Sequence, residues 1–111
     1  MYTYKAHVLR TIDGDTCELD VDLGFSIHVR QHVRLLGINA PEHDTAEGKK
    51  AAAYLSGMIP NGVELTVETV RDKSEKYGRT LGKLVLKDGR VVNDEMVKAG
   101  LAKPYFGGKR E

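Results

Sequence analysis

The sequence has 111 residues and a mass of 12.3 kDa, enough for one folded domain but not for two. Its 17 basic residues nearly balance 16 acidic ones, so the net charge of +1 excludes a general attraction of the whole chain to polyanions. The single cysteine, Cys17, excludes an intrachain disulfide and a zinc site built from several cysteines. We therefore expect one domain, residues 1–111, whose ligand preference comes from local clusters of charge.

The first third of the chain alternates apolar and polar residues with the period of β-strands. One strand is predicted over residues 5–12 and a second over 17–23. A turn then leads to a third strand over 25–35, whose apolar residues occupy odd positions from Phe25 onward. Arg34 lies on the opposite, polar phase of this strand, where a side chain can reach a ligand.

The rest of the chain predicts two helices and two further strands. Residues 46–59 read as a helix, and strands are expected over 63–68 and 80–86. A second helix is expected from Asn93, a plausible N-cap, to Gly100. Five short strands, with a helix after the third and another near the C-terminus, predict a mainly β, α+β fold: a five-stranded Greek-key barrel of the OB type. An open antiparallel α+β sheet is the alternative.

Two segments carry the chemistry. The first is the turn Asp13-Gly14-Asp15-Thr16, and the second runs from Arg34 through Asn39 and Pro41 to Glu42. Carboxylate and amide oxygens are ligands for Ca²⁺ or Mg²⁺, and the planar arginine fork matches phosphate oxygens. Each segment also has an ordinary explanation, because Asp-Gly is a common hairpin turn and Glu42 could be a solvated residue beside a helix entry.

Hydrolysis of a phosphodiester needs an activated water, neutralised phosphate oxygens and a stabilised leaving oxygen. Arg34, Arg79 and a metal held by Asp15 could neutralise the charge, and Glu42 would remain to orient or deprotonate the water. Tyr77, which adjoins the second arginine segment, is either a surface aromatic or a stacking platform for a splayed base.

Four motifs together resemble one known family, the staphylococcal nuclease-like (thermonuclease) domain. They are DGDT at 13–16, RLLGINAPE at 34–42, KYGR at 76–79 and VNDEMVKAGLA at 92–102. The resemblance implies an OB barrel and Ca²⁺-dependent cleavage of DNA and RNA at the bond to the 5′ oxygen, leaving 3′-phosphates. It implies roles for ten residues: catalysis by Arg34, Glu42 and Arg79; calcium binding by Asp15, Asn39 and the Ala40 carbonyl; support from Asp13; and substrate contacts from Lys76, Tyr77 and Tyr105.

One departure from the family pattern concerns the metal. Asn39 stands where the resemblance expects a second calcium-binding aspartate, so we expect weaker Ca²⁺ binding than in relatives with an acid there. The rival function is a non-catalytic OB-type module that binds nucleic acid or protein, although such copies usually lose the arginines or the glutamate that this chain retains.

The expected partner is DNA or RNA, single-stranded or frayed. The N-terminal residues lack the apolar run of a signal peptide, and no stretch is apolar enough to span a membrane. We therefore expect a cytoplasmic monomer without membrane contacts.

Overall fold

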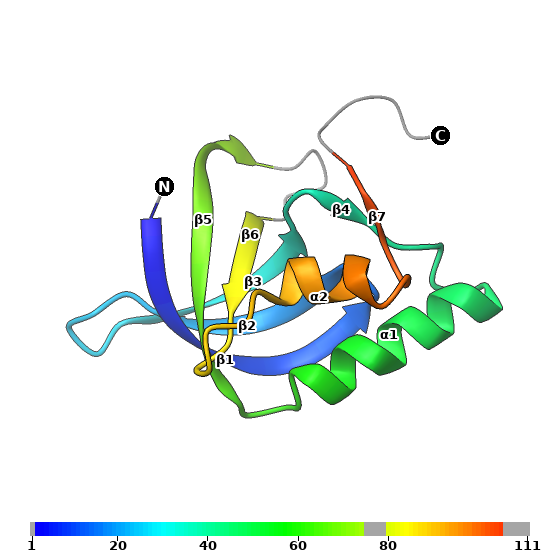
Figure 1. The fold of residues 1–111 in the computed structure, drawn as a ribbon. Helices are drawn as coiled ribbons and strands as arrows, with labels where there is room; N and C mark the ends of the chain where they lie inside the picture. Colours follow the sequence, from blue (N-terminus) through cyan, green and yellow to red (C-terminus); the bar gives the residue numbers. More distant parts are fainter. Residues whose placement is uncertain (1, 75–79, 106–111) are drawn as a thin grey trace.

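The computed structural model describes residues 2–74 and 80–105. Its elements, in chain order, are β1 (Tyr2–Asp13), β2 (Thr16–Asp22), β3 (His28–Leu35), β4 (Ile38–Asn39), α1 (Ala46–Met58), β5 (Glu64–Ser74), β6 (Thr80–Val85), α2 (Val92–Lys98) and β7 (Lys103–Pro104). Figure 1 shows the long, bent strands wrapping around one another, with both helices packed beside them.

Five of the strands form a closed barrel in the order β1, β2, β3, β6, β5. Neighbours pair antiparallel except at the closure, where Val33–Leu35 of β3 runs parallel to Thr80–Gly82 of β6. This closed barrel with two helices confirms the predicted OB-type α+β fold, and it excludes the open sheet.

A second, two-stranded sheet was not predicted from the sequence. β4 pairs antiparallel with β7, placing Asn39 opposite Lys103. Two residues per strand are too few to produce a detectable alternation. This sheet is important for the candidate site, because it places the residues that follow Arg34 beside the residues that precede Tyr105.

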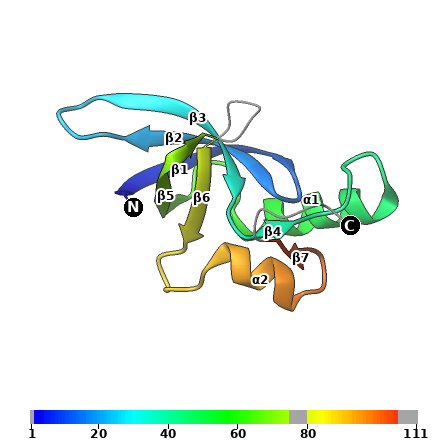
Figure 2. The same ribbon diagram turned by 90° about the horizontal axis from the view of Figure 1, so that it is seen from above.

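Apolar side chains that alternate along the strands fill the barrel, as the period of two requires. Leu19, Val67 and Leu84 are fully buried from three different strands. Helix α1 buries Leu55, and its C-cap Ile59 is buried as well. Both views show α1 lying along one side of the barrel, with α2 near it (Figures 1 and 2).

The prediction that Asn93 caps the second helix is wrong. The N-cap is Val91, which makes no side-chain capping bond, and Asn93 is buried in the first turn. Its amide oxygen accepts from Leu84 N at 3.0 Å, and its Nδ2 donates to Leu36 O at 2.8 Å and Gly82 O at 3.1 Å. Tertiary hydrogen bonds to β6 and to the segment after β3 therefore replace the local cap.

The third strand is shorter than expected. β3 begins at His28, and Phe25 lies in the turn before it, where Ile27 N donates to Gly24 O at 2.9 Å. Phe25 is 98% exposed and Ile27 54% exposed, so these odd-numbered residues do not join the core. The alternation predicted correctly which side chains face the core only within β3 itself, where the strand is paired with its neighbours in the barrel.

Among the described residues, no helix has the length and apolar character needed to cross a membrane.

Candidate active site

Asp15 is anchored where the turn between β1 and β2 meets the end of β3. Its backbone carbonyl accepts from Leu35 N at 2.8 Å. Its carboxylate is buried, with Oδ1 accepting from Thr16 Oγ1 at 3.1 Å and Oδ2 from Ala40 N at 2.9 Å. A carboxylate in a dry environment needs such donors, and the three contacts fix its direction.

Gly14 explains how the turn comes so close to the rest of the molecule. A Cβ at this position would stand 2.6 Å from the Cβ of Ala51 on α1 and 2.8 Å from the Cβ of Ala40. Both distances are too short for real carbon atoms. The hairpin turns at Gly14 and Asp15, between the paired residues Asp13 and Thr16, and the glycine lets α1 and the Ala40 segment close against Asp15.

Arg34, the second member of the site, projects from the end of β3 and is only 9% exposed. Its Nη2 donates to Asn39 Oδ1 at 3.1 Å and pairs with Asp15 Oδ2 at 3.5 Å, while Nη1 donates to Leu35 O at 3.2 Å. The two oxygens predicted as calcium ligands thus converge on one nitrogen of this guanidinium. Their bonds fix its plane.

Tyr105 closes the other side of Arg34. The ring centroid lies 5.6 Å from the guanidinium carbon, within the range of a cation–π contact. The backbone N–H of Tyr105 donates to Gly37 O at 2.7 Å, directly after the β4–β7 pairing. The short sheet therefore carries the tyrosine to the arginine.

Two hollows adjoin this centre. One, of about 870 Å³, begins at Arg34 and Tyr105 and extends along α2, with mostly apolar walls that include Val97. The other, of about 350 Å³, lies between Asn39–Glu42 and residues 100–103. Arg34 and Asn39 stand at the border of the two, so a phosphate at Arg34 would have space on either side.

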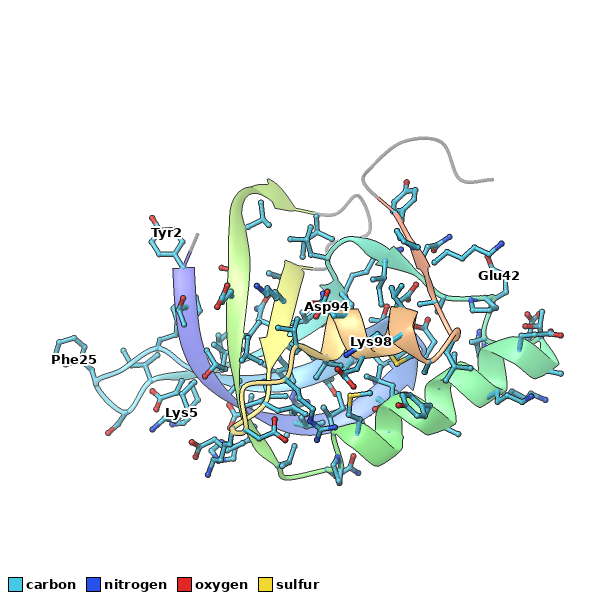
Figure 3. All side chains as sticks on the ribbon, viewed as in Figure 1. Tyr2, Lys5, Phe25, Glu42, Asp94 and Lys98 are labelled. Atoms are coloured by element: carbon cyan, nitrogen blue, oxygen red, sulfur yellow. The ribbon has the colours of Figure 1, made fainter. Side chains whose placement is uncertain are left out.

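Glu42 lies on the loop between β4 and α1, where its side chain is exposed (Figure 3). The backbone around it is well fixed, because its carbonyl accepts from Thr45 N at 3.1 Å and from Thr45 Oγ1 at 2.7 Å. The same hydroxyl caps α1 by accepting from Gly48 N at 2.9 Å. One threonine therefore links the glutamate's position to the start of the helix.

Asp13 ends β1 and contacts the turn that carries Asp15. Its Oδ1 accepts from Asp15 N at 3.1 Å. Burial raises the pKa of the Asp13 carboxyl, and a side-chain hydrogen bond with the Asp15 carboxyl and the negative charge of that group raise it further, while the bond from Asp15 N opposes the rise. Asp13 is thus a half-buried support for the turn.

The oxygens at this centre suit a hard cation, but they carry little charge. Asp15 contributes one carboxylate and Asn39 a neutral amide, and Ala40 adjoins both. Across residues 2–74 and 80–105 there is no cluster of three or more histidine, cysteine or acidic side chains placed to bind a metal. A divalent ion would therefore need backbone carbonyls and water to complete its oxygen shell.

Lys76, Tyr77 and Arg79 lie outside the described residues, so their predicted roles remain predictions. The structure adds Thr16, Gly48 and Asn93 as residues that position the site; Thr16 and Asn93 lie within motifs quoted above, but no positioning role was predicted for them. Each of these residues acquires its role through contacts that form only in the folded chain, so local sequence spacing could not have shown that role.

Comparison with known proteins shows the family of this chain. Residues 32–111 match the family described as staphylococcal nuclease homologue. Endonuclease YhcR of Bacillus subtilis (strain 168) is 33% identical over 114 residues, covering 93% of this chain and 9% of that protein. Thermonuclease of Staphylococcus hyicus is 31% identical over 110 residues, covering 94% and 60% respectively. Protein ParB of Escherichia coli is 38% identical over 109 residues, covering 91% and 57%. The chain thus spans less than two thirds of each of these relatives.

Proposed function

Because the chain belongs to the staphylococcal nuclease homologue family, we propose that it is a nuclease that hydrolyses phosphodiester bonds of DNA or RNA. The observation that supports this most is the setting of Arg34. A guanidinium fixed by Asp15 and Asn39, with an aromatic ring beside it, is oriented in advance to bind a phosphate.

Water attacks the phosphorus in the proposed reaction, and the bond from phosphorus to the 5′ oxygen breaks. The water's proton leaves through Glu42, the 5′ oxygen gains a proton, and the products are a 3′-phosphate and a 5′-hydroxyl. Glu42 is suited to this role, since its backbone is fixed and its carboxylate is exposed beside the hollow at Asn39. Arg34, together with Arg79, would balance the charge that grows on the phosphate oxygens.

Calcium is proposed as the cofactor, with Asp15, Asn39 and the Ala40 carbonyl as its protein ligands. When bound, such an ion polarises the phosphate and stabilises a hydroxide. The protein's own share is to hold these oxygens in place through Thr16, the Ala40 amide and the β4–β7 pairing. Lys76, Tyr77 and Tyr105 are proposed to contact the nucleotide, and the cytoplasm is the proposed location.

Digestion of a 5′-labelled oligonucleotide with Ca²⁺, repeated with a chelator, tests the proposal. The wild-type protein should cut only with the metal, and Glu42→Gln should lower the rate by about 100-fold or more. Glu47→Gln is the matched control, because Glu47 is an exposed acid in the first turn of α1 and should keep nearly full activity. Binding of the oligonucleotide without cleavage, under every metal condition, would instead favour the non-catalytic binding module.

A further inference from the structure

The end of α2 determines where the chain enters β7. Gly100 follows the helix with a positive φ of 76°, a backbone conformation that favours glycine. Its N–H donates to Val97 O at 3.0 Å, and the next N–H, that of Leu101, donates to Met96 O at 3.1 Å. These two bonds are the Schellman pattern of a helix C-terminus. The chain therefore turns sharply and continues into β7, which begins at Lys103.

Lys103 shares a face of the two-stranded sheet with groups that contact Arg34. It stands directly opposite Asn39 in the antiparallel pair of β4 and β7 (Figure 1). Side chains at opposed positions point to the same side of a sheet, with Cβ atoms about 4.5–5.5 Å apart. On that side, Asn39 Oδ1 accepts from Arg34. Tyr105, two residues after Lys103, contacts Arg34 as well, as the strand period of two requires. Lys103 is therefore placed beside the phosphate proposed at Arg34.

Lys103 also lines the smaller of the two hollows, the one between residues 39–42 and 100–103. The volume of this hollow, about 350 Å³, is near the lower end of the range for ligand pockets, so it can hold one nucleotide but not several. Two of its lining residues carry a charge, Glu42 and Lys103, and both are exposed. Because Glu42 is assigned to the attacking water, Lys103 supplies the positive charge that a second phosphate would need.

The geometry of the proposed reaction indicates which part of the strand enters the smaller hollow. Displacement at phosphorus is in line, so the leaving 5′ oxygen departs on the side opposite the attacking water. Glu42, which serves the water, borders the smaller hollow, whereas the larger hollow runs from Arg34 along α2. The leaving nucleotide therefore belongs on the side of the larger hollow. The smaller hollow is left for the nucleotide that keeps the phosphate.

We propose that the smaller hollow is a subsite for the nucleotide on the 5′ side of the scissile phosphate, and that Lys103 binds the next phosphate beyond that nucleotide. This inference rests on the proposed nuclease function, which supplies the anionic strand. The position of Lys103 adds the course of that strand past Asn39. Cleavage then favours bonds that have a further phosphate on their 5′ side over the bond nearest an unphosphorylated 5′ end.

The charges around the subsite are compatible with a second phosphate. Asp15 is buried, and three donors already satisfy its carboxylate. Glu42 accepts the proton of the attacking water in the proposed reaction, so its negative charge acts at the scissile phosphate. Lys103 takes part in none of the ion pairs among the residues that the structure describes, and its ammonium can therefore turn to a ligand.

Two short single strands that differ in one charge test the proposal. The first has an ordinary phosphodiester at one central position and uncharged methylphosphonates elsewhere. The second also has an ordinary phosphodiester at the next position toward the 5′ end. The initial rate of cleavage at the central bond is measured with Ca²⁺ by separating the products, and the affinity for each strand is measured by fluorescence anisotropy in chelator.

Wild-type protein should cut the central bond of the doubly charged strand about three- to fivefold faster than that of the singly charged strand, the size expected for one exposed ionic contact. Lys103→Gln should lose this preference and keep nearly the wild-type rate on the singly charged strand. It should also lower the slope of log affinity against log salt by about 0.7 for the doubly charged strand alone. Lys103→Arg should keep the preference, because it keeps the charge.

The control variant removes a lysine elsewhere. Lys87 is 73% exposed and lies 3.9 Å from Glu64 of β5, outside both hollows, so Lys87→Gln should keep the full preference. Misfolding should not interfere, because Lys103 is exposed and pairs with β4 through its backbone. Equal urea midpoints of Lys103→Gln and wild type would confirm this.

The outcomes separate this inference from the proposed function. If wild type cuts both strands at equal rates, there is no phosphate contact on the 5′ side, and only this inference fails. If Lys103→Gln slows both strands by the same factor, the lysine acts on the scissile phosphate and the subsite is refuted. If wild type cuts neither strand, the nuclease proposal fails. Tighter binding of the doubly charged strand that Lys103→Gln abolishes would then still support the contact, and equal binding would refute it.

Discussion

Two identical substitutions in helix α1 should have opposite effects on stability, because Gly48 and Gly57 have different surroundings. A Cβ at Gly48 would overlap the carbonyl oxygen of Glu42 and stand 2.9 Å from the Cα of His43. A Cβ at Gly57 would meet no atom within 4 Å. Gly48 therefore lets the first turn of α1 close against the loop that carries Glu42, whereas Gly57 has no such role.

The expected difference in stability between the two variants can be estimated because their gain in helix propensity cancels. Replacing glycine by alanine inside a helix gains up to about 1 kcal/mol of helix propensity, and that gain is common to both variants. Gly57→Ala should therefore be stabilised by up to about this amount. Gly48→Ala must also displace backbone atoms, and overpacking costs about 1 to 3 kcal/mol. Gly48→Ala should thus be less stable than Gly57→Ala by about 1 to 3 kcal/mol.

Urea denaturation of both variants beside wild type measures this difference directly. The nuclease assay adds a second readout, since Gly48→Ala shifts the backbone of Glu42 and should slow cleavage more than Gly57→Ala does. If Gly48→Ala unfolds at the same urea concentration as Gly57→Ala, or at a higher one, the reasoning about the Glu42 loop is refuted.

Three further predictions concern single side chains. Asn93→Leu should cost at least about 2 kcal/mol in urea denaturation, because the buried N–H of Leu84 and the carbonyl of Leu36 lose their bonds to the Asn93 amide, while Gly82 O keeps its bond from Leu36 N. A loss below about 0.5 kcal/mol would contradict this. Arg10→Gln, which removes the hydrogen bond that Arg10 Nε donates to Glu18 at 3.0 Å, should raise the Glu18 pKa toward its ordinary value of 4.5, as read by NMR titration. Because the pKa of Glu18 is lowered in the folded protein, its carboxylate adds stability above pH 4.5, and this stability is lost as the pH falls through the pKa of the folded state. Acid unfolding of Arg10→Gln should therefore begin at a higher pH than that of wild type. An unchanged midpoint of acid unfolding would contradict a stabilising role of the Arg10–Glu18 bond. Asn39→Asp should tighten Ca²⁺ binding at least about tenfold in calorimetry, because it adds a negative charge beside Asp15, and equal affinities would remove Asn39 from the ligand set.

The sequence predicted what local patterns control. Alternation predicted the strands of the barrel, and helical spacing together with Pro60-Asn61-Gly62 predicted α1 to within one residue at its end. The sequence-based prediction was wrong at Asn93, because this side chain makes three tertiary hydrogen bonds instead of capping the helix. It failed again at Phe25, since alternation cannot show where a strand leaves its partners and enters a turn.

For the candidate site, too, the sequence predicted the chemical groups but not the contacts that orient them. Asp15, Asn39 and Arg34 were predicted as chemical groups, and the fold brings an oxygen of Asp15 and an oxygen of Asn39 within 3.5 Å of Arg34 Nη2. Their orientation depends on Thr16, on a glycine without space for a Cβ and on a two-residue sheet. These features are contacts between distant segments, so they follow only from the folded chain.

The shared use of two oxygens links the arginine to the proposed metal. Asp15 Oδ2 and Asn39 Oδ1 both face Nη2 of Arg34, and Asp15 is the only one of the two that carries a charge. A second cation at these oxygens would compete with the guanidinium for one negative charge. The Leu35 carbonyl and the Tyr105 ring also contact Arg34, and neither depends on that carboxylate. They could therefore keep the guanidinium in place if Asp15 turned its charge toward the proposed metal. An aspartate at position 39 would relieve the competition, because each cation could then have a carboxylate of its own.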